Sequence, residues 1–246
     1  MTDAARAVLT LWDRVISLAE QAQPLDWTRP TPDPDMTVRD VVSHVAAGTA
    51  IPAGPAVSAA ELVEGLRLAR AEYEARLAAV TRHHDRHIDH DATHLRRQLG
   101  ATCLDLYVHT HDLSTALGVP VDLDDDSPAV TEACQYLLGL TPHLFAGRAG
   151  AQEGQALRVG LPGMAQRGPV LAAAEGATVT VADGRGLWRP DGVDGDDAVG
   201  VVTAKPAAFV LLLAGRGDPG HWRDRGALEW SGDSGEAFVR KARLFA

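Results

Sequence analysis

Residues 103–118, CLDLYVHTHDLSTALG, belong to an apolar helical pattern that begins at about Thr93 and carries closely spaced Asp and His side chains. Gly118 and Pro120 follow the last turn of this pattern. Glycine readily adopts the left-handed conformation that ends a helix, and proline cannot continue one. The stretch therefore predicts one long helix over residues 93–117.

Other segments before residue 149 also repeat apolar residues at helical spacing. Two of them begin with a capping-box pattern, Thr37 with Asp40 and Ser58 with Glu61, which satisfies the free N–H groups at a helix start. The additional helices are expected over residues 4–22, 37–45, 58–80 and 127–138. With the helix over 93–117, they predict an antiparallel four-helix bundle over residues 1–148, supplemented by one or two short helices.

Beyond Gly147 glycines become frequent, and short β-type runs alternate with turn signals. The runs are LRVGL, ATVTVADG, GLWRPD and AVGVVTA. Pro206 then starts an apolar helix, and a last helical piece follows Ser234. Because the linker AGRAGAQEG separates the helical pattern from the β-type pattern, we expect a second, small α+β domain over residues 149–246. The predicted fold class is α plus α+β.

The formal net charge of the 246 residues is −10, which disfavours two classes of partner. Negative charge repels nucleic-acid phosphates and anionic lipids, and no run of Lys and Arg offsets it. The N-terminus lacks the basic start and apolar core of a signal peptide, and no apolar run is long enough to span a membrane. We therefore expect a soluble cytoplasmic protein, monomer or dimer, that binds a small-molecule substrate and neither nucleic acid nor membrane.

The cysteines of the chain are Cys103 and Cys134, which lie inside apolar helical patterns and not in CxxC spacing. We expect two buried, reduced thiols. The sequence also lacks a GxGxxG fingerprint, a Walker loop and a GxSxG elbow. Nucleotide chemistry is therefore disfavoured.

Asp105 and His109 are four residues apart, so they project from one face of the helix over residues 93–117. A carboxylate and an imidazole so placed can bind one divalent cation; the alternative is a hydrogen bond between them on the helix surface. His44, in the apolar run DVVSHVAAG, is the candidate third ligand, with a hydrogen-bonded core histidine as the alternative. Two facing helices would then form a metal site with open coordination positions.

Five further histidines lie in the polar stretch HHDRHIDHDATH, residues 83–94. Their i,i+4 pairs could bind a metal ion, but the stretch is almost without apolar residues. An exposed site lacks the surrounding groups that fix ligands, so a solvated loop and helix start is the favoured interpretation. His111 and Asp112 adjoin the main pair, and His111 is expected to contact a ligand side chain or the substrate and not the ion.

Two segments resemble signatures of the mycothiol-dependent maleylpyruvate isomerase family, within the DinB-like bundle superfamily. They are WTRPTPDPDMTVRDVVSHVAAG, residues 27–48, and CLDLYVHTHDLSTALG, residues 103–118. FVLLLAGR, residues 209–216, looks like part of the family's smaller α+β domain, which is related to sterol-carrier-type folds. The chain departs from the family at Asp105, where Glu is common, at residues 32–36, and at His111, where Trp is frequent.

The resemblance implies that His44, Asp105 and His109 hold a divalent ion, for which Zn²⁺ is expected and nickel, iron and manganese are alternatives. A low-molecular-weight thiol, mycothiol in the family, would lose its proton at the ion. It would add to the cis double bond of a small unsaturated oxo or dicarboxylic acid such as maleylpyruvate, and leave after rotation. Arg216 is the candidate for holding a substrate carboxylate; the alternative is an arginine bound to helix-end carbonyl groups. A thiol S-transferase and a non-catalytic binding protein remain alternative functions.

Overall fold

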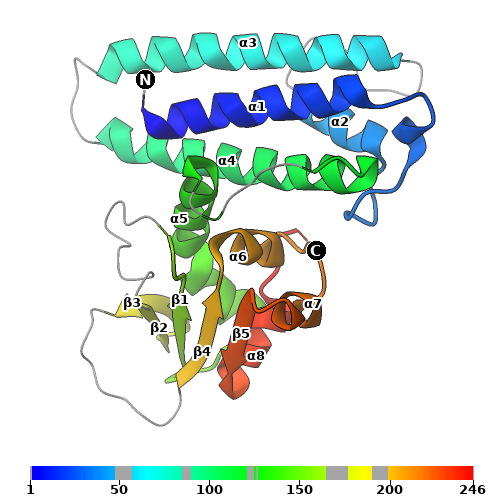
Figure 1. Ribbon diagram of the computed structural model, residues 1–246. Helices are drawn as coiled ribbons and strands as arrows, with labels where there is room; N and C mark the ends of the chain where they lie inside the picture. Colours follow the sequence, from blue (N-terminus) through cyan, green and yellow to red (C-terminus); the bar gives the residue numbers. More distant parts are fainter. Residues whose placement is uncertain are drawn as a thin grey trace. The chain divides into compact units, whose positions relative to one another are not determined.

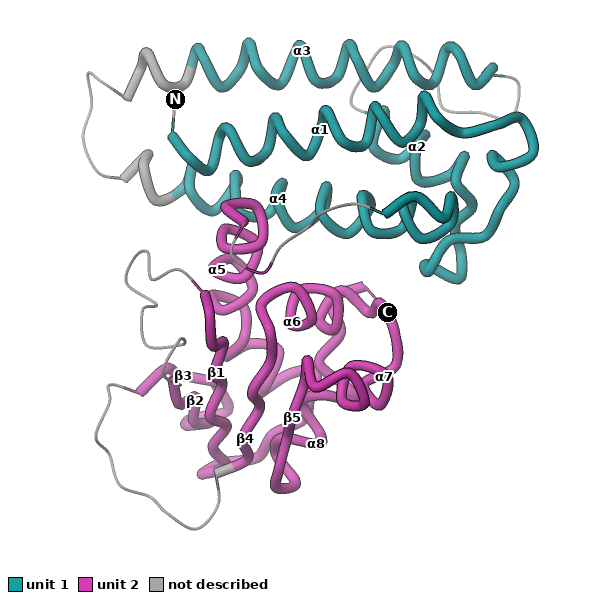
Figure 2. Tube along the Cα trace, viewed as in Figure 1, with its two compact units in different colours: residues 1–122 teal, residues 123–246 magenta. Residues whose placement is uncertain are grey.

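The computed structural model describes residues 2–47, 57–84, 90–120, 125, 127–164, 177–189 and 199–245, without the side chains of 80–93 and 199 (Figure 1). The chain divides into two compact units, residues 1–122 and residues 123–246 (Figure 2). The N-terminal unit is helical and the C-terminal unit contains a sheet with helices, so the predicted combination of α and α+β structure is confirmed.

The N-terminal unit contains one short helix among longer ones. Its α-helices are α1 (Asp3–Gln21), α2 (Val38–Ala46), α3 (Ala59–His84) and α4 (His90–Leu117). α1 packs against α3 and α4, and α2 packs against the same two helices. Because α2 has nine residues, whereas α3 has 26 and α4 has 28, it covers only part of their length.

Reciprocal hydrogen bonds fix the starts of α2 and α3, as the capping-box patterns predicted. The N–H of Thr37 donates to the Asp40 carboxylate at 2.9 Å, and the N–H of Asp40 donates to Thr37 Oγ1 at 3.3 Å. The N–H of Ser58 donates to the Glu61 carboxylate at 2.7 Å, and that of Glu61 donates to Ser58 Oγ at 3.2 Å. These bonds satisfy N–H groups that lack partners within the helix.

The apolar faces of these helices meet in a core that anchors the functional side chains. Its fully buried members include Leu11, Leu62, Leu66, Leu104, Leu106 and Tyr107. Burying one such leucine contributes roughly 1.5–3 kcal/mol relative to exposure. Among the helices the structure describes, none combines the length and the apolar character that a membrane span needs.

The C-terminal unit is built on a mixed sheet. Its strands are β1 (Ala156–Gly160), β2 (Ala177–Ala182), β3 (Arg185–Arg189), β4 (Val199–Ala204) and β5 (Leu228–Ser231), in the order β3-β2-β1-β4-β5. β1 and β4 are parallel, and the other neighbouring pairs are antiparallel. The helices are α5 (Pro128–His143), continued by the π-helical turn η2 (Leu144–Arg148), then α6 (Pro206–Leu213), α7 (Pro219–Asp224) and α8 (Gly232–Lys241).

The four predicted β-type runs correspond to β1 to β4, whereas β5 and α7 were not predicted. Both elements are short, with four and six residues, so neither shows a full period of its pattern. The signal for α7 was the Asp218–Pro219 pair, because the Asp218 carboxylate accepts a hydrogen bond from the N–H of Gly220 at 2.7 Å.

The contacts divide the chain at residues 122/123, whereas the sequence suggested a boundary at 148/149. The difference is α5, which the sequence analysis counted among the bundle helices. α5 packs against α6, β2 and β3. Its Cys134 thiol donates to the carbonyl oxygen of Pro206 at 3.4 Å, and its Leu138 carbonyl accepts from Trp188 Nε1 at 3.2 Å.

Candidate metal centre

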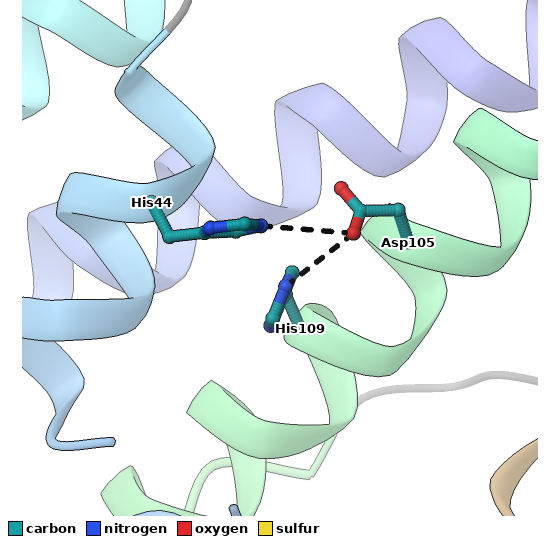
Figure 3. Close-up of side chains that lie close together, drawn as sticks. All are labelled: His44, Asp105 and His109. Carbon is teal, nitrogen blue, oxygen red and sulfur yellow. Dashed lines mark ion pairs between the residues drawn. The ribbon is translucent and has the colours of Figure 1, made fainter. Parts of the chain in front are cut away.

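α2 and α4 bring His44, Asp105 and His109 together (Figure 3). Asp105 Oδ1 lies 3.8 Å from His44 Nε2 and 3.6 Å from His109 Nε2. The two imidazole rings meet edge to face, with 4.9 Å between their centroids. The three residues that the sequence analysis selected as metal ligands therefore converge on one point.

Buried neighbours on each helix fix these side chains in place. Val41 and Val45 of α2 are buried, so the helix is anchored on that side and His44 projects beside the packed face. On α4, Leu106 and Val108 are almost fully buried next to His109. A ligand carried by a rigid, packed helix needs little reorganisation when an ion binds.

The donor set fits a divalent ion with an open coordination position. Its donor atoms all lie within 4.8 Å of one another. Two donors that each lie 2.0–2.1 Å from a tetrahedral ion are about 3.3 Å apart, so binding an ion requires side-chain rotations that bring the more distant donors closer by up to about 1.5 Å. The side chains of His44 and Asp105 are 50% and 45% exposed, whereas His109 is 7% exposed, so a small molecule can approach from the side of the first two.

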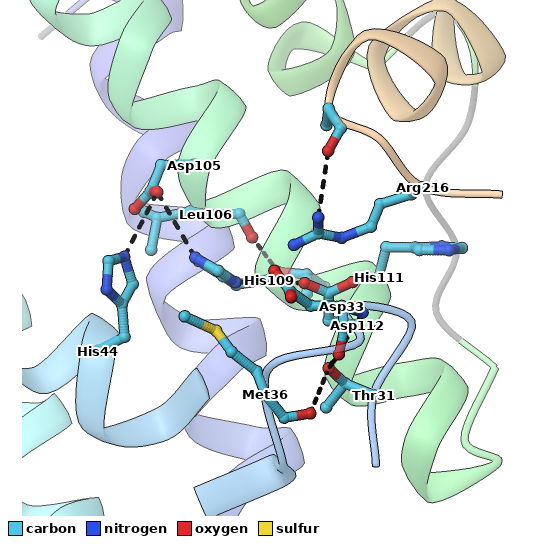
Figure 4. Close-up of polar contacts among 12 residues, drawn as sticks. Thr31, Asp33, Met36, His44, Asp105, Leu106, His109, His111, Asp112 and Arg216 are labelled. Carbon is cyan, nitrogen blue, oxygen red and sulfur yellow. Dashed lines mark hydrogen bonds and ion pairs between the residues drawn. The ribbon is translucent and has the colours of Figure 1, made fainter. Parts of the chain in front are cut away.

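Asp112 is a further member of the site that the sequence analysis did not assign a role. Its fully buried carboxylate oxygen Oδ2 lies 3.3 Å from Nδ1 of His109 (Figure 4). The contact is an ion pair without hydrogen-bond geometry, and a negative charge this close favours the proton on Nδ1, which leaves Nε2, facing Asp105, as the metal-binding nitrogen. The signal for this role was the i,i+3 spacing of the two residues on one helix.

The charges of the site favour a protonated His109 when no ion is bound. Burial alone would raise the pKa of Asp105, but the imidazoles of His109 and His44 outweigh it and hold that pKa well below its ordinary value. Burial alone would lower the pKa of His109, but Asp105 and Asp112 raise it from 6.5 to about 9. A divalent cation bound to His109 Nε2 would replace the proton on the side of Asp105, while the proton on Nδ1 stays beside Asp112.

We expect the stability of the metal-free protein to fall as the pH rises and its affinity for metal to increase. The pKa of His109 is higher in the folded than in the unfolded chain, so its stabilisation is complete below about 6.5 and is lost as the pH rises through about 9. Metal affinity should increase over the same range, because the ion displaces a proton. Urea unfolding and zinc titration across this range measure both trends. If the stability of a His109→Gln variant falls with rising pH as much as that of the unmodified protein, the prediction is contradicted.

Replacing Asp112 should weaken metal binding without removing a ligand. Asp112→Asn keeps the side-chain shape but removes the charge beside His109 Nδ1, so we expect metal affinity to fall roughly 10- to 100-fold. Competition with a chelator measures the affinity. Asp35→Asn, which removes a charge at an exposed position of the same unit, is the control and should leave the affinity unchanged. Equal affinities of the two variants would refute the role of Asp112.

The remaining candidates are Arg216 and the histidine-rich stretch. Arg216 is buried in the C-terminal unit, and its guanidinium donates to the carbonyl oxygen of Ala214 just after α6, at 3.1 Å. This is the helix-end contact that the sequence analysis gave as the alternative, and carboxylate binding by Arg216 stays a prediction. Of the histidine-rich stretch, residues 85–89 and the side chains up to residue 93 lie outside the described part; His94 is exposed.

Comparison with family models gives a match near the start of the sequence. Residues 8–51 match the family model described as mycothiol maleylpyruvate isomerase N-terminal domain. The matched segment contains most of α1, all of α2 and His44, whereas Asp105 and His109 lie outside it. No curated protein shows significant similarity to the chain.

Proposed function

We propose that this protein is a metal- and thiol-dependent isomerase, because residues 8–51 match the family model described as mycothiol maleylpyruvate isomerase N-terminal domain. Its substrate would be a small oxo or dicarboxylic acid with a cis double bond, such as maleylpyruvate. The observation that supports this proposal most is the convergence of two imidazoles and one carboxylate from α2 and α4. The same proposal includes a DinB-like bundle for the helical unit and a sterol-carrier-like fold for the C-terminal unit.

His44, Asp105 and His109 would hold the divalent ion, for which Zn²⁺ suits the ligand set. When bound, such an ion lowers the pKa of a thiol that coordinates it and so provides a thiolate near neutral pH. Asp112 orients His109, and the half-exposed His44 and Asp105 leave room for a thiol and an electrophile. Arg216 remains the candidate for a substrate carboxylate.

The nucleophile in this proposal is a separate small thiol, because the protein's own cysteines are unsuited to the task. Cys103 and Cys134 are both buried, and neither is in a disulfide. Burial raises the pKa of Cys134 far above its ordinary value, which disfavours its thiolate. Cys103 lies on α4 with no exposed surface. A diffusible thiol such as mycothiol can instead enter from the exposed side of the candidate centre.

The decisive experiment is reconstitution of the purified protein with Zn²⁺, mycothiol and maleylpyruvate. We expect isomerisation only when both metal and thiol are present, with the thiol recovered unchanged. A stable thiol adduct detected by mass spectrometry would instead identify an S-transferase. If the protein shows no turnover and binds no metal, the enzymatic proposal is refuted and a binding protein is favoured.

A further inference from the structure

A groove of about 460 Å³ lies between α3 and α4. Its polar lining residues are Tyr73 and Arg76 of α3 and Gln98 and Thr102 of α4, and Leu77 and Leu95 form its apolar wall. The functional proposal has not assigned a role to any of these residues. The groove lies wholly within the N-terminal unit.

The groove lies beyond the C-terminal end of the short helix α2, along α4. Arg29, which precedes α2, donates to the carbonyl oxygen of Ala116 near the end of α4, whereas His44 in the last turn of α2 reaches Asp105. α2 therefore runs antiparallel to α4 and ends before the N-terminal half of that helix. Thr102 and Gln98 come next along α4, about 4.5 Å and 10 Å from Asp105 along the helix axis. One end of the groove thus adjoins the candidate metal centre.

Arg76 gives the groove a positive charge that can bind an anion. Its guanidinium lies 5.9 Å from the centre of the Tyr73 ring. In the described part of α3 the ion pairs involve Arg67 and Arg70, and none involves Arg76. In a chain of net charge −10, a cation without a carboxylate partner beside a groove favours an anionic ligand.

The polar groups around Arg76 suit one end of a small organic acid. The Tyr73 hydroxyl lies 3.3 Å from Thr102 Oγ1. Burial raises the pKa of Tyr73, so its hydroxyl stays protonated at neutral pH, and it can turn from Thr102 to donate to a bound carboxylate. Gln98 adds an amide donor, and Leu77 and Leu95 can contact a carbon chain.

We propose that this groove binds the carboxylate-bearing end of the dicarboxylic or oxo-acid substrate, and that Arg76 pairs with its carboxylate. The inference rests on the function proposed above and adds a residue that determines substrate specificity. A substrate anchored there extends along α4 toward Asp105, so its double bond would approach the candidate metal centre. Arg76 holds the substrate and takes no part in bond making.

The binding test uses succinate, a dicarboxylate without a double bond, and the full-length metal-free protein. Succinate cannot undergo thiol addition or coordinate an ion there, so the result is independent of turnover. We expect succinate to shift the backbone amide NMR signals of Gln98 and Thr102, and Arg76→Gln to weaken binding about tenfold. Arg97→Gln removes the same charge from an exposed position outside the groove lining and should change binding less than twofold.

Equal weakening by the two variants, or a succinate response confined to residues away from the groove, would overturn the inference. Neutral succinamide should give no comparable shifts, and binding as tight as that of succinate would also overturn it. If the protein isomerises maleylpyruvate, Arg76→Gln should raise KM about tenfold while kcat changes little. An unchanged KM would exclude the groove while leaving the proposed reaction intact.

Discussion

His109→Ala should leave the purified protein without stoichiometric metal and lower kcat/KM at least about a hundredfold. His109 is the most buried of the three proposed ligands, with its two nitrogens facing Asp105 and Asp112. Removing it leaves one imidazole and one carboxylate, and two ligands do not make a site with tetrahedral selectivity. Elemental analysis of the protein and steady-state kinetics in the presence of zinc and thiol measure both effects.

The same substitution also affects folding, so a second variant is needed. Asp112 is fully buried, and loss of His109 removes a charge partner from this carboxylate, so we expect His109→Ala to destabilise the helical unit. His44→Ala avoids this problem, because His44 is half exposed, and it should also abolish stoichiometric metal binding. His94→Ala, at an exposed position on α4, is the matched control and should retain metal and activity. Full metal retention in His44→Ala and His109→Ala would refute the assigned centre.

The local part of this centre could be predicted from the sequence, because helix geometry fixes the relation of residues four apart. Asp105 and His109 share a face of α4 as soon as that segment is helical. His44 is different, since its convergence with them depends on how α2 packs against α4. No periodicity in the sequence specifies that packing, so the residue pattern made His44 only a candidate, and the family resemblance implied its role as the third ligand. The same spacing argument could have identified Asp112, which follows His109 by three residues on the same helix.

The placement of α5 could not be derived from its own sequence. The helix buries Val130, Ala133, Cys134, Leu137 and Leu138. A broad apolar surface of this kind can cover either another helix or a sheet, so the pattern gives the helix but not its partner. The partner depends on β2, β3 and α6, which are distant in sequence. β2 and β3 were predicted as separate runs, and in the structure Asp183 and Gly184, both with positive φ, form the two-residue turn that joins them into a hairpin.

Gly200→Ala should destabilise the C-terminal unit by about 3 kcal/mol, the upper end of the usual cost of overpacking. A Cβ atom at residue 200 would lie 2.2 Å from the backbone nitrogen of Gly235 and 2.7 Å from Cβ of Ser234. These neighbours belong to α8, which packs on β4. β4 pairs with β1 on one side and β5 on the other, so the strand cannot shift without breaking a ladder.

Comparison with two other glycines isolates the cause of this effect. Gly186→Ala would place its Cβ 2.1 Å from the carbonyl oxygen of Pro142, but β3 is an edge strand and can move, so we expect a smaller loss of about 1 kcal/mol. Gly139→Ala on α5 meets no atom within 4 Å and should stabilise the unit by about 0.4–1 kcal/mol, since alanine favours the helix. Urea unfolding, followed by the NMR signals of the sheet, ranks the three variants. Because the proposed ligands lie on α2 and α4, all three variants should keep the metal content of the unmodified protein. If Gly200→Ala is as stable as Gly139→Ala, α8 does not pack closely on β4.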